Sequence, residues 1–198
     1  MKKYYGNATS GGIAVGKIKK LQRIYIPDDL HKITDTAQER KRLEDAVCMV
    51  DQRLELLYKN VLQIAGEENA EIFAMHRMIL KDREYLEQIY QCIEGEKESA
   101  VKAVRSAEAV ASEEFRQMPD DYMKERAIDI VDISRQLIEV LTNRENDVQL
   151  EEPSIIVAED LTPSQTMRLN RDMVLAFAAK RGSRNSHTAI LIRMLKIP

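Results

Sequence analysis

Hydrophobic residues between positions 33 and 143 recur with the period of an α-helix. The first stripe alternates spacings of three and four residues, and it predicts one long helix from about Thr36 to Gly66. A second stripe, formed by Ile72, Met75 and Ile79, either continues or turns into a third pattern around residues 81–82. The members of the first stripe are Leu43, Val47, Val50, Leu54, Leu57, Val61 and Ile64.

Two more patterns follow in the same region. Apolar residues from Val101 to Phe115 form a helical stripe that Pro119 ends, and a last stripe begins near Asp120 and reaches Leu141. The connections between these patterns are short, so we expect neighbouring helices to run antiparallel. The region therefore predicts a bundle of four or five helices.

The two flanks of the chain have a different pattern. Glycines interrupt residues 6–18, which favours turns or close backbone approach beside a short strand. A β-branched run at 154–158 predicts a buried strand, and Thr162 begins a helix with a capping box. A strand at 173–178 then leads through a polar loop to a final helix that begins at residue 186 or 187. Strand–helix alternation of this kind is typical of an α/β domain.

The helical region thus interrupts an α/β domain. We expect residues 1–32 and 144–198 to form one α/β domain and residues 33–143 to form a separate helical domain inserted into it.

Composition narrows the classes of protein. The chain has 198 residues, 44% of them hydrophobic, which is enough for a packed core, and a formal charge of −3. No apolar run approaches the ~18–20 residues of a membrane span, and no apolar stretch follows the first five residues, so we expect a cytoplasmic protein. Cys48 and Cys92 lie in helical patterns and are expected to be core residues. The near-neutral charge and the lack of Trp argue against a general nucleic-acid binder.

Charge is distributed unevenly along the chain. Residues 33–143 contain 24 acidic and 15 basic residues, a net of −9, whereas the flanks have a net of +6. An acidic surface favours a basic partner and speeds its encounter, although a solvated helical face explains most such runs.

A basic loop with a histidine precedes the last predicted helix. Lys180, Arg181 and Arg184 supply positive charge, Gly182 permits close backbone approach, and His187 lies at the start of the helix. Open α/β sheets bind ligands at the edge where the strands end, and a helix N-terminus favours anions such as phosphate.

These residue types predict phosphoryl chemistry. Ser186 can cap the helix, Thr188 can donate a hydroxyl to a phosphoryl oxygen, and a neutral imidazole is a nucleophile near neutral pH. The alternative is a surface histidine in a basic loop that binds nothing, and spacing alone leaves both open. Neither His31 nor His76 forms a recognisable ligand pair with His187, so no metal site is predicted.

The same loop resembles a known motif. Residues 182–190, GSRNSHTAI, are similar to the phosphohistidine motif GGRTSHTAI of the Enzyme I family, the phosphoenolpyruvate-protein phosphotransferases of the bacterial sugar phosphotransferase system. Residues 157–164 resemble the family segment that precedes this motif, and residues 10–16 resemble its N-terminal segment. In the helical region, residues 66–68, 72–73, 76 and 121–127 are similar to the family's helical insertion, which related phosphohistidine domains do not share.

The resemblance implies a fold and a phosphoryl-carrier role. The fold would be of the α+β or α/β class, a swivelling phosphohistidine domain with an inserted four- to five-helix bundle. His187 would take a phosphoryl group from phosphoenolpyruvate on Nε2 and pass it to a histidine of the phosphocarrier HPr in sugar uptake. Thr166 would bond the resting imidazole, and Arg184 would neutralise phosphate charge with Thr188 nearby. Gly182 and Ser186 would belong to the phosphate loop.

The resemblance also implies that the chain is an N-terminal fragment. The family's chain continues beyond Pro198 into further strands and a barrel that binds phosphoenolpyruvate and Mg²⁺ and forms the homodimer. We therefore expect this stretch to need no cofactor of its own and to exchange phosphate with HPr, without using phosphoenolpyruvate alone.

The helical insertion would be the surface that binds HPr, whose basic rim suits the net of −9. His76 could instead be a core residue, and a role as a second phosphate carrier is the least favoured. The residues that match interface positions are Glu67, Glu68, His76, Met78, Ile79, Asp82, Glu84, Tyr122 and Arg126.

The chain departs from the family motif at two positions, and three other functional interpretations stay open. Ser183 and Asn185 replace a glycine and a threonine of the family motif, and neither change removes the nucleophile. The alternatives are a nitrogen-regulatory Enzyme I, a related phosphohistidine-domain protein, and a non-catalytic helical docking module.

Overall fold

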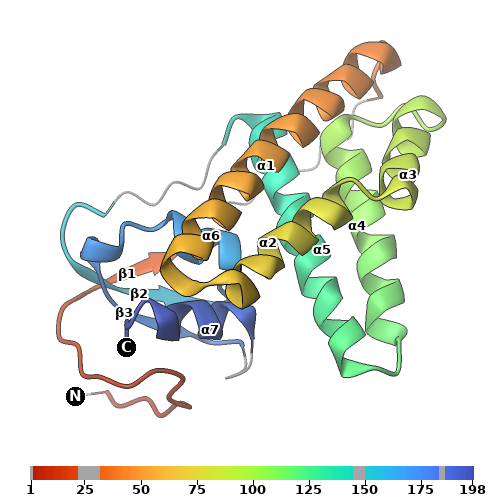
Figure 1. Cartoon of the computed structure of the whole chain (residues 1–198). Coiled ribbons are helices and arrows are strands. Elements are labelled where there is room, and N and C mark those ends of the chain that lie inside the picture. The colour runs from red at the N-terminus through yellow and green to blue at the C-terminus, as the bar shows by residue number, and fades with distance from the viewer. Residues whose placement is uncertain (1, 22–31, 145–149, 183–185) are drawn as a thin grey trace. The chain divides into compact units, whose positions relative to one another are not determined.

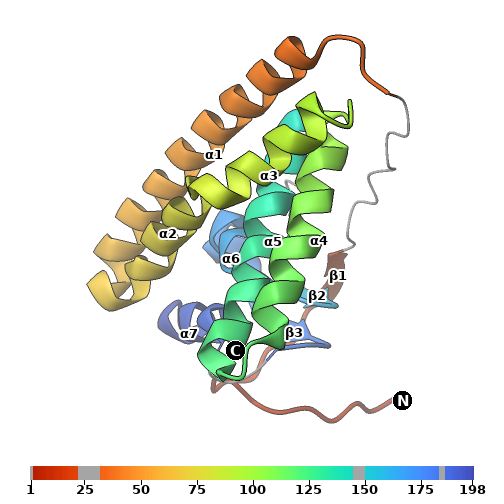
Figure 2. The same cartoon turned by 90° about the vertical axis from the view of Figure 1, so that its right-hand side faces the viewer.

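A computed structural model describes residues 2–21, 32–144, 150–182 and 186–198. Five helices of this described part follow one another along the chain, as Figures 1 and 2 show. Their bounds are Thr36–Ala65 for α1, Glu67–Leu80 for α2, Arg83–Glu94 for α3, Ala100–Gln117 for α4 and Asp121–Thr142 for α5.

The second and third predicted patterns are separate helices. The second pattern does not continue through residues 81–82, because Asp82 is the N-cap of a new helix, α3. Its carboxylate accepts a hydrogen bond from the Tyr85 amide at 2.9 Å. Gly66 separates α1 from α2 with a φ of +80°, a conformation that glycine adopts without strain.

Two compact units make up the chain, and each is described by itself. The α/β unit comprises Met1–Ile24, Asn60–Ala70 and Asp147–Pro198, and the helical unit comprises Tyr25–Lys59 and Glu71–Asn146. The sequence-based division assigned the whole of 33–143 to the helical domain, whereas the structure groups residues 60–70 with the α/β unit.

The helical unit buries most of the predicted stripes. The four α5 positions of the predicted stripe, Ile130, Ile133, Leu137 and Leu141, are all buried. In α1 the buried stripe includes Ala46, while Val47 is only half-buried, so the prediction was wrong by one residue there. Ile64, in the last turn of α1, was also wrongly predicted, because 55% of its surface is exposed.

Burial corrects the prediction for one of the two cysteines. Cys48 is exposed on α1 and is not a core residue. Cys92 on α3 is half-buried, and this burial raises the pKa of its thiol.

A parallel sheet forms the centre of the α/β unit. Strands β1 (Lys17–Leu21), β2 (Ser154–Ala158) and β3 (Val174–Ala179) lie in the order β1-β2-β3, and both pairings are parallel. Helix α6 (Pro163–Arg168) and a short 3₁₀ turn (Arg171–Met173) connect β2 to β3, and α7 (His187–Met194) follows β3. A helical bundle with a parallel sheet confirms the predicted fold class.

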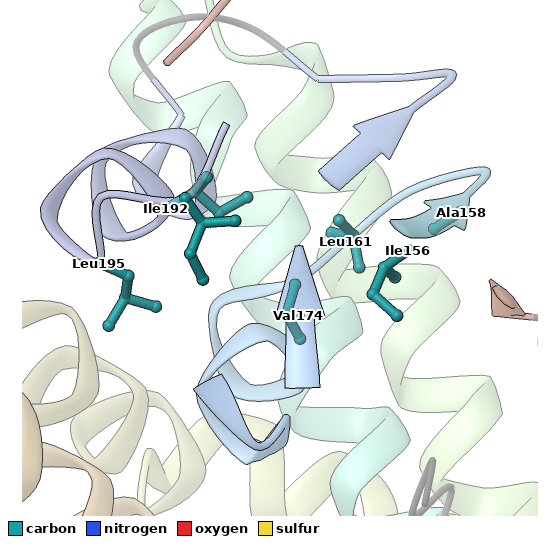
Figure 3. Packing of buried hydrophobic residues seen from close by; sticks show 7 residues of the cluster. Ile156, Ala158, Leu161, Val174, Ile192 and Leu195 are labelled. Atoms are coloured by element: carbon teal, nitrogen blue, oxygen red, sulfur yellow. The ribbon is translucent and has the colours of Figure 1, made fainter. Parts of the chain in front are cut away.

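A small apolar core packs α7 against this sheet, and Figure 3 shows its side chains. Ile156 on β2 is fully buried, and Val174 on β3 and Ile192 on α7 each expose less than a tenth of their surface. The other members are Ala158, Leu161, Leu195 and Ile197. Because α7 is held through this core, the residue at its N-terminus is fixed relative to the strand ends.

Close backbone approach explains two glycines of the N-terminal segment, as predicted. A Cβ atom added to Gly16 would lie 2.4 Å from Cδ1 of Leu175, and one added to Gly12 would lie 2.5 Å from Cγ of Pro198. Gly12 also has a φ of +139°, which side-chain-bearing residues rarely adopt.

We found no helix in the described part of the chain that is both long and apolar enough to span a membrane.

Candidate phosphohistidine site

The site forms where β2 and β3 end. The amide of Lys180 donates to the carbonyl of Ala158 at 3.0 Å, and the amide of Arg181 donates to the carbonyl of Glu159 at 2.9 Å. These two bonds extend the pairing of the strands into the segments that follow them. The loop that leads to α7 therefore begins at the carboxyl edge of the sheet, where α/β proteins bind ligands.

His187 is the first residue of α7 and is half-buried. Ser186 precedes it as the N-cap, with its hydroxyl accepting a hydrogen bond from the Ala189 amide at 3.3 Å. This geometry confirms the predicted helix start. It places the imidazole at the end of a helix where backbone N–H groups and the positive end of the dipole favour an anion.

Thr188 anchors the start of α7. Its hydroxyl donates to the carbonyl of Leu161 at 2.9 Å, which joins α7 to the segment between β2 and α6. Sequence reasoning assigned this hydroxyl to a phosphoryl oxygen and missed the Leu161 carbonyl, because a backbone acceptor 27 positions away leaves no pattern in the sequence.

Helix α6 begins with the predicted capping box. Thr162 accepts from the Gln165 amide, while the Gln165 side chain accepts from the Thr162 amide at 3.3 Å. Thr166 lies one turn further and exposes 2% of its surface. Its hydroxyl donates to the Thr162 carbonyl at 3.0 Å, so its oxygen keeps lone pairs that can accept a further hydrogen bond.

Charges around the loop are exposed and positive on balance. Lys180 Nζ and Arg181 Nη2 lie 3.7 Å and 3.6 Å from the same carboxylate oxygen of Glu159. One carboxylate faces two cations, so positive charge remains for an anionic ligand. Gly182 has a φ of +126°, and among the described residues, its chain neighbours aside, no atom lies within 4 Å of an added Cβ. Arg184, Ser183 and Asn185 lie outside the described residues.

Comparisons with known proteins agree on one family. The model "PEP-utilising enzyme, N-terminal" matches residues 5–126, and "PEP-utilising enzyme, mobile domain" matches residues 150–198. A solution structure of an Enzyme I protein is similar with a TM-score of 0.76 and 34% identity, over 96% of this chain and 78% of that one.

The chain belongs to the Enzyme I family.

Curated relatives and a second structure extend this result. A phosphoenolpyruvate-protein phosphotransferase of Geobacillus stearothermophilus is 37% identical over 100% of this chain, and that of Bacillus subtilis is 34% identical over the same share. The N-terminal domain of a nitrogen Enzyme I is similar with a TM-score of 0.68 and 25% identity, over 96% of this chain and 79% of that one. The chain spans about a third of the length of these curated relatives, 34% and 35% respectively.

Most of the residues that resemble partner-binding positions of Enzyme I lie on exposed surface. Glu67 and Glu68 occupy the first turn of α2, and Met78, near its other end, is 73% exposed. Asp82 and Glu84 begin α3. Ile79 and Arg126 are half-buried, and the side chain of Tyr122 lies outside the described residues. The partner-binding role of these residues stays a prediction.

His76 is the exception. Its side chain exposes 0% of its surface, and Nε2 lies 3.1 Å from Oδ1 of Asp129 on α5. This burial favours the core alternative over a direct contact, and the partner-binding role of His76 stays a prediction. The spacing of His76 from Phe73 and Leu80 in the sequence places all three on one helix face. In the structure all three are fully buried.

Proposed function

We propose that this chain is the phosphoryl-carrier part of a phosphoenolpyruvate-protein phosphotransferase, in which His187 holds the phosphoryl group between phosphoenolpyruvate and HPr. The observation that supports the proposal most directly is the position of His187, half-buried at the first residue of α7 and at the carboxyl edge of a parallel sheet. The match of both parts of the chain to Enzyme I supports it independently.

The transfer step conserves atoms and charge without a further reactant. In the exchange with HPr, the lone pair of an unprotonated ring nitrogen, Nε2 in this proposal, attacks phosphorus on the phosphohistidine of the carrier. A new P–N bond forms as the P–N bond on the carrier breaks, and the carrier imidazole leaves with the electron pair. The same step runs backwards when His187 returns the group, so one site serves both directions.

The protein's contribution is positioning and charge. Ser186 and the first turn of α7 present N–H groups to the phosphoryl oxygens, and Lys180 and Arg181 add exposed positive charge. Thr166 accepts an N–H of the resting imidazole in this proposal, since its own proton is donated to Thr162. Thr188 acts through its bond to Leu161, which fixes the angle of the helix start.

Phosphoenolpyruvate enters the proposal through the longer relatives. This chain spans 34% of the Geobacillus stearothermophilus protein, whose name includes phosphoenolpyruvate. We propose that in a full-length protein the phosphoryl donor, with its Mg²⁺, is bound by other parts of the chain, in a cytoplasmic sugar phosphotransferase system.

Labelling from phosphorylated HPr tests the proposal. The purified 198-residue chain should take up phosphate that is acid-labile and base-stable, and mass spectrometry should locate it on His187. His187→Ala should lose the label completely yet bind HPr within about threefold, because the substitution leaves the helical unit unchanged. His31→Ala, which removes another of the three histidines, is the matched control and should label like the wild type. A folded wild-type chain that acquires no label would contradict the proposal and favour a non-catalytic docking module.

A further inference from the structure

The contact between α2 and α5 contains a cluster of buried ionisable groups that phosphoryl transfer does not use. His76 on α2 and Asp132 on α5 are both 0% exposed, and Asp129 is 4% exposed. His76 Nε2 donates to Asp129 Oδ1 at 3.1 Å, while its Nδ1 lies 3.8 Å from Asp132 Oδ2, which is too long for a hydrogen bond. Asp132 instead accepts from Arg135 at 3.0 Å.

Stability alone gives little reason for this arrangement. A buried carboxylate loses hydration that its partners only partly return, and apolar residues of similar volume often stabilise a core at least as well. The best-attested use of such a group is to fix the register between two helices. A hydrogen bond has a required distance and direction, whereas an apolar contact tolerates sliding and rotation. The ring of Phe73, edge-on to His76 with centroids 6.1 Å apart, further limits rotation of the imidazole.

The register fixed by this bond bears on the partner surface. Met78 and Ile79 follow His76 by two and three residues on α2, and Arg126 precedes Asp129 by three residues on α5. Each therefore lies within one turn of the bond. A one-residue change in the register of α2 would turn its surface by about 100° and change where Met78 and Ile79 lie relative to α5.

We propose that His76 and Asp129 are positioning residues for partner binding. Their hydrogen bond holds α2 and α5 in one register and so sets how Met78 and Ile79 on α2 lie relative to Arg126 on α5, and neither His76 nor Asp129 touches the partner. This inference rests on the proposed function, because it takes HPr as the molecule that the surface binds.

Affinity for HPr, measured on folded variants, tests the inference. His76→Phe keeps a ring beside Phe73 but removes the donor. It should weaken binding about tenfold if only about a tenth of the free protein then keeps the binding register. His76→Gln can place an N–H near the Nε2 position and should bind within about threefold of the wild type. Asp129→Leu should match His76→Phe, and the double variant should bind no more weakly than either single one.

A matched control separates positioning from stability. Glu39 is another buried carboxylate of the helical unit, 8% exposed, and it accepts from the Ala100 amide at 2.9 Å. No proposed partner-binding residue lies within a turn of Glu39 or Ala100. Glu39→Gln should lower the melting temperature yet leave HPr affinity unchanged, and stabilities of all variants are measured alongside.

The outcomes separate this inference from the proposed function. Full affinity in folded His76→Phe, or additive losses in the double variant, would overturn the positioning role while the proposed function stands. If His76→Phe does not fold, weak binding by the folded His76→Gln and Asp129→Asn variants would overturn it equally, since both retain the bond. A wild-type chain that does not bind HPr would overturn the proposed function itself.

Discussion

The two units differ in what they bury. The helical unit encloses ionisable residues, and Glu39, His76, Glu98, Asp129, Asp132 and Glu139 each expose less than a tenth of their surface. In the described part of the α/β unit, the buried polar side chains are the hydroxyls of Ser154, Thr162, Ser164 and Thr166, while Glu159, Lys180 and Arg181 are exposed.

This difference suits two kinds of work. In the helical unit, buried charged groups bind helix ends and neighbouring helices. For example, the Glu39 carboxylate accepts a hydrogen bond from the first amide of α4. In the α/β unit the hydroxyl of Thr166 binds a local backbone carbonyl, and the charges of Lys180 and Glu159 stay at the surface, where we propose that a phosphoryl group binds. The helical unit thus buries ionisable groups between its helices, whereas the α/β unit leaves its charged groups exposed.

Matched apolar truncations should produce the largest effects and establish the common baseline. Ile133→Ala on α5 and Ile156→Ala on β2 each remove a fully buried side chain, so each should cost about 2–5 kcal/mol of unfolding free energy in its own unit. Amide hydrogen exchange measures both units in one experiment. Ile156→Ala should speed exchange in β2, β3 and α7 and leave α4 and α5 near the wild-type rate. Equal acceleration throughout both units would show that they unfold as one.

Salt should weaken HPr binding strongly. The acidic residues proposed to bind HPr, such as Glu67 and Glu84, are exposed and therefore screened, whereas buried charges are screened much less. Raising the salt concentration from about 50 mM to about 500 mM should weaken binding by about tenfold or more. Calorimetry across this range measures the slope, and the thermal stability of the helical unit should change little. An affinity independent of salt would show that the exposed acids do not bind HPr.

Local sequence patterns predicted the elements well, and the failures have a physical cause. The α5 stripe and the Thr162 capping box depend only on neighbours within two turns, and the structure confirms both. The predicted stripe placed Met75 in the core in place of His76, and the two choices differ by a rotation of one residue. The spacing of His76 from Phe73 and Leu80 favours the observed choice, but its hydrogen-bond acceptor on α5 lies 53 positions away and leaves no local pattern.

The site shows the same limit. The cap Ser186 and the start of α7 at His187 follow from the local pattern. The bond from Thr188 to Leu161 and the bond from Lys180 to Ala158 could not be predicted, because both end on backbone carbonyls that any residue supplies. Side-chain identity therefore suggests a chemistry for this site, but it does not predict the backbone hydrogen bonds that fix its geometry.

Substitutions at one helix cap in each unit should have smaller effects on stability. Ser99 accepts from the Lys102 amide at the start of α4, and Ser186 accepts from the Ala189 amide at the start of α7. Substitution by Ala should cost about 1 kcal/mol in each unit. Ser186→Ala should also slow phosphoryl transfer, because His187 is the next residue, whereas Ser99→Ala should not. Stopped-flow transfer rates with phosphorylated HPr distinguish the two, and equal slowing would mean that the α7 cap has no special role.

The smallest expected effect is a pH dependence within the helical unit. Arg77 donates to Asp51 at 2.7 Å, and this hydrogen bond lowers the pKa of the Asp51 carboxyl below its ordinary value. A lowered pKa in the folded state means that the stabilisation is present above the unfolded pKa of about 4 and is lost as pH falls through the folded value.

Asp51→Asn should therefore lower the unfolding free energy by at most about 1 kcal/mol at pH 7, and the difference from wild type should shrink below about pH 4. Chemical denaturation at several pH values measures this, with Glu159→Gln in the α/β unit as the exposed control. A difference that persists unchanged to pH 2 would assign the effect to packing and not to charge.

If His187 carries a phosphoryl group as proposed, the cap of α7 affects how readily that group is transferred. A phosphoryl group on His187 would place roughly two negative charges beside the positive end of a helix, which strengthens such a helix by about 0.3–2 kcal/mol. Thermodynamic linkage makes the relation mutual: whatever the group adds to the folding of α7, the folded helix subtracts from the group's tendency to leave. The rise in the melting temperature of the α/β unit on phosphorylation therefore reports how far the folded helix lowers the free energy released by phosphoryl transfer. A larger rise means a weaker phosphoryl donor.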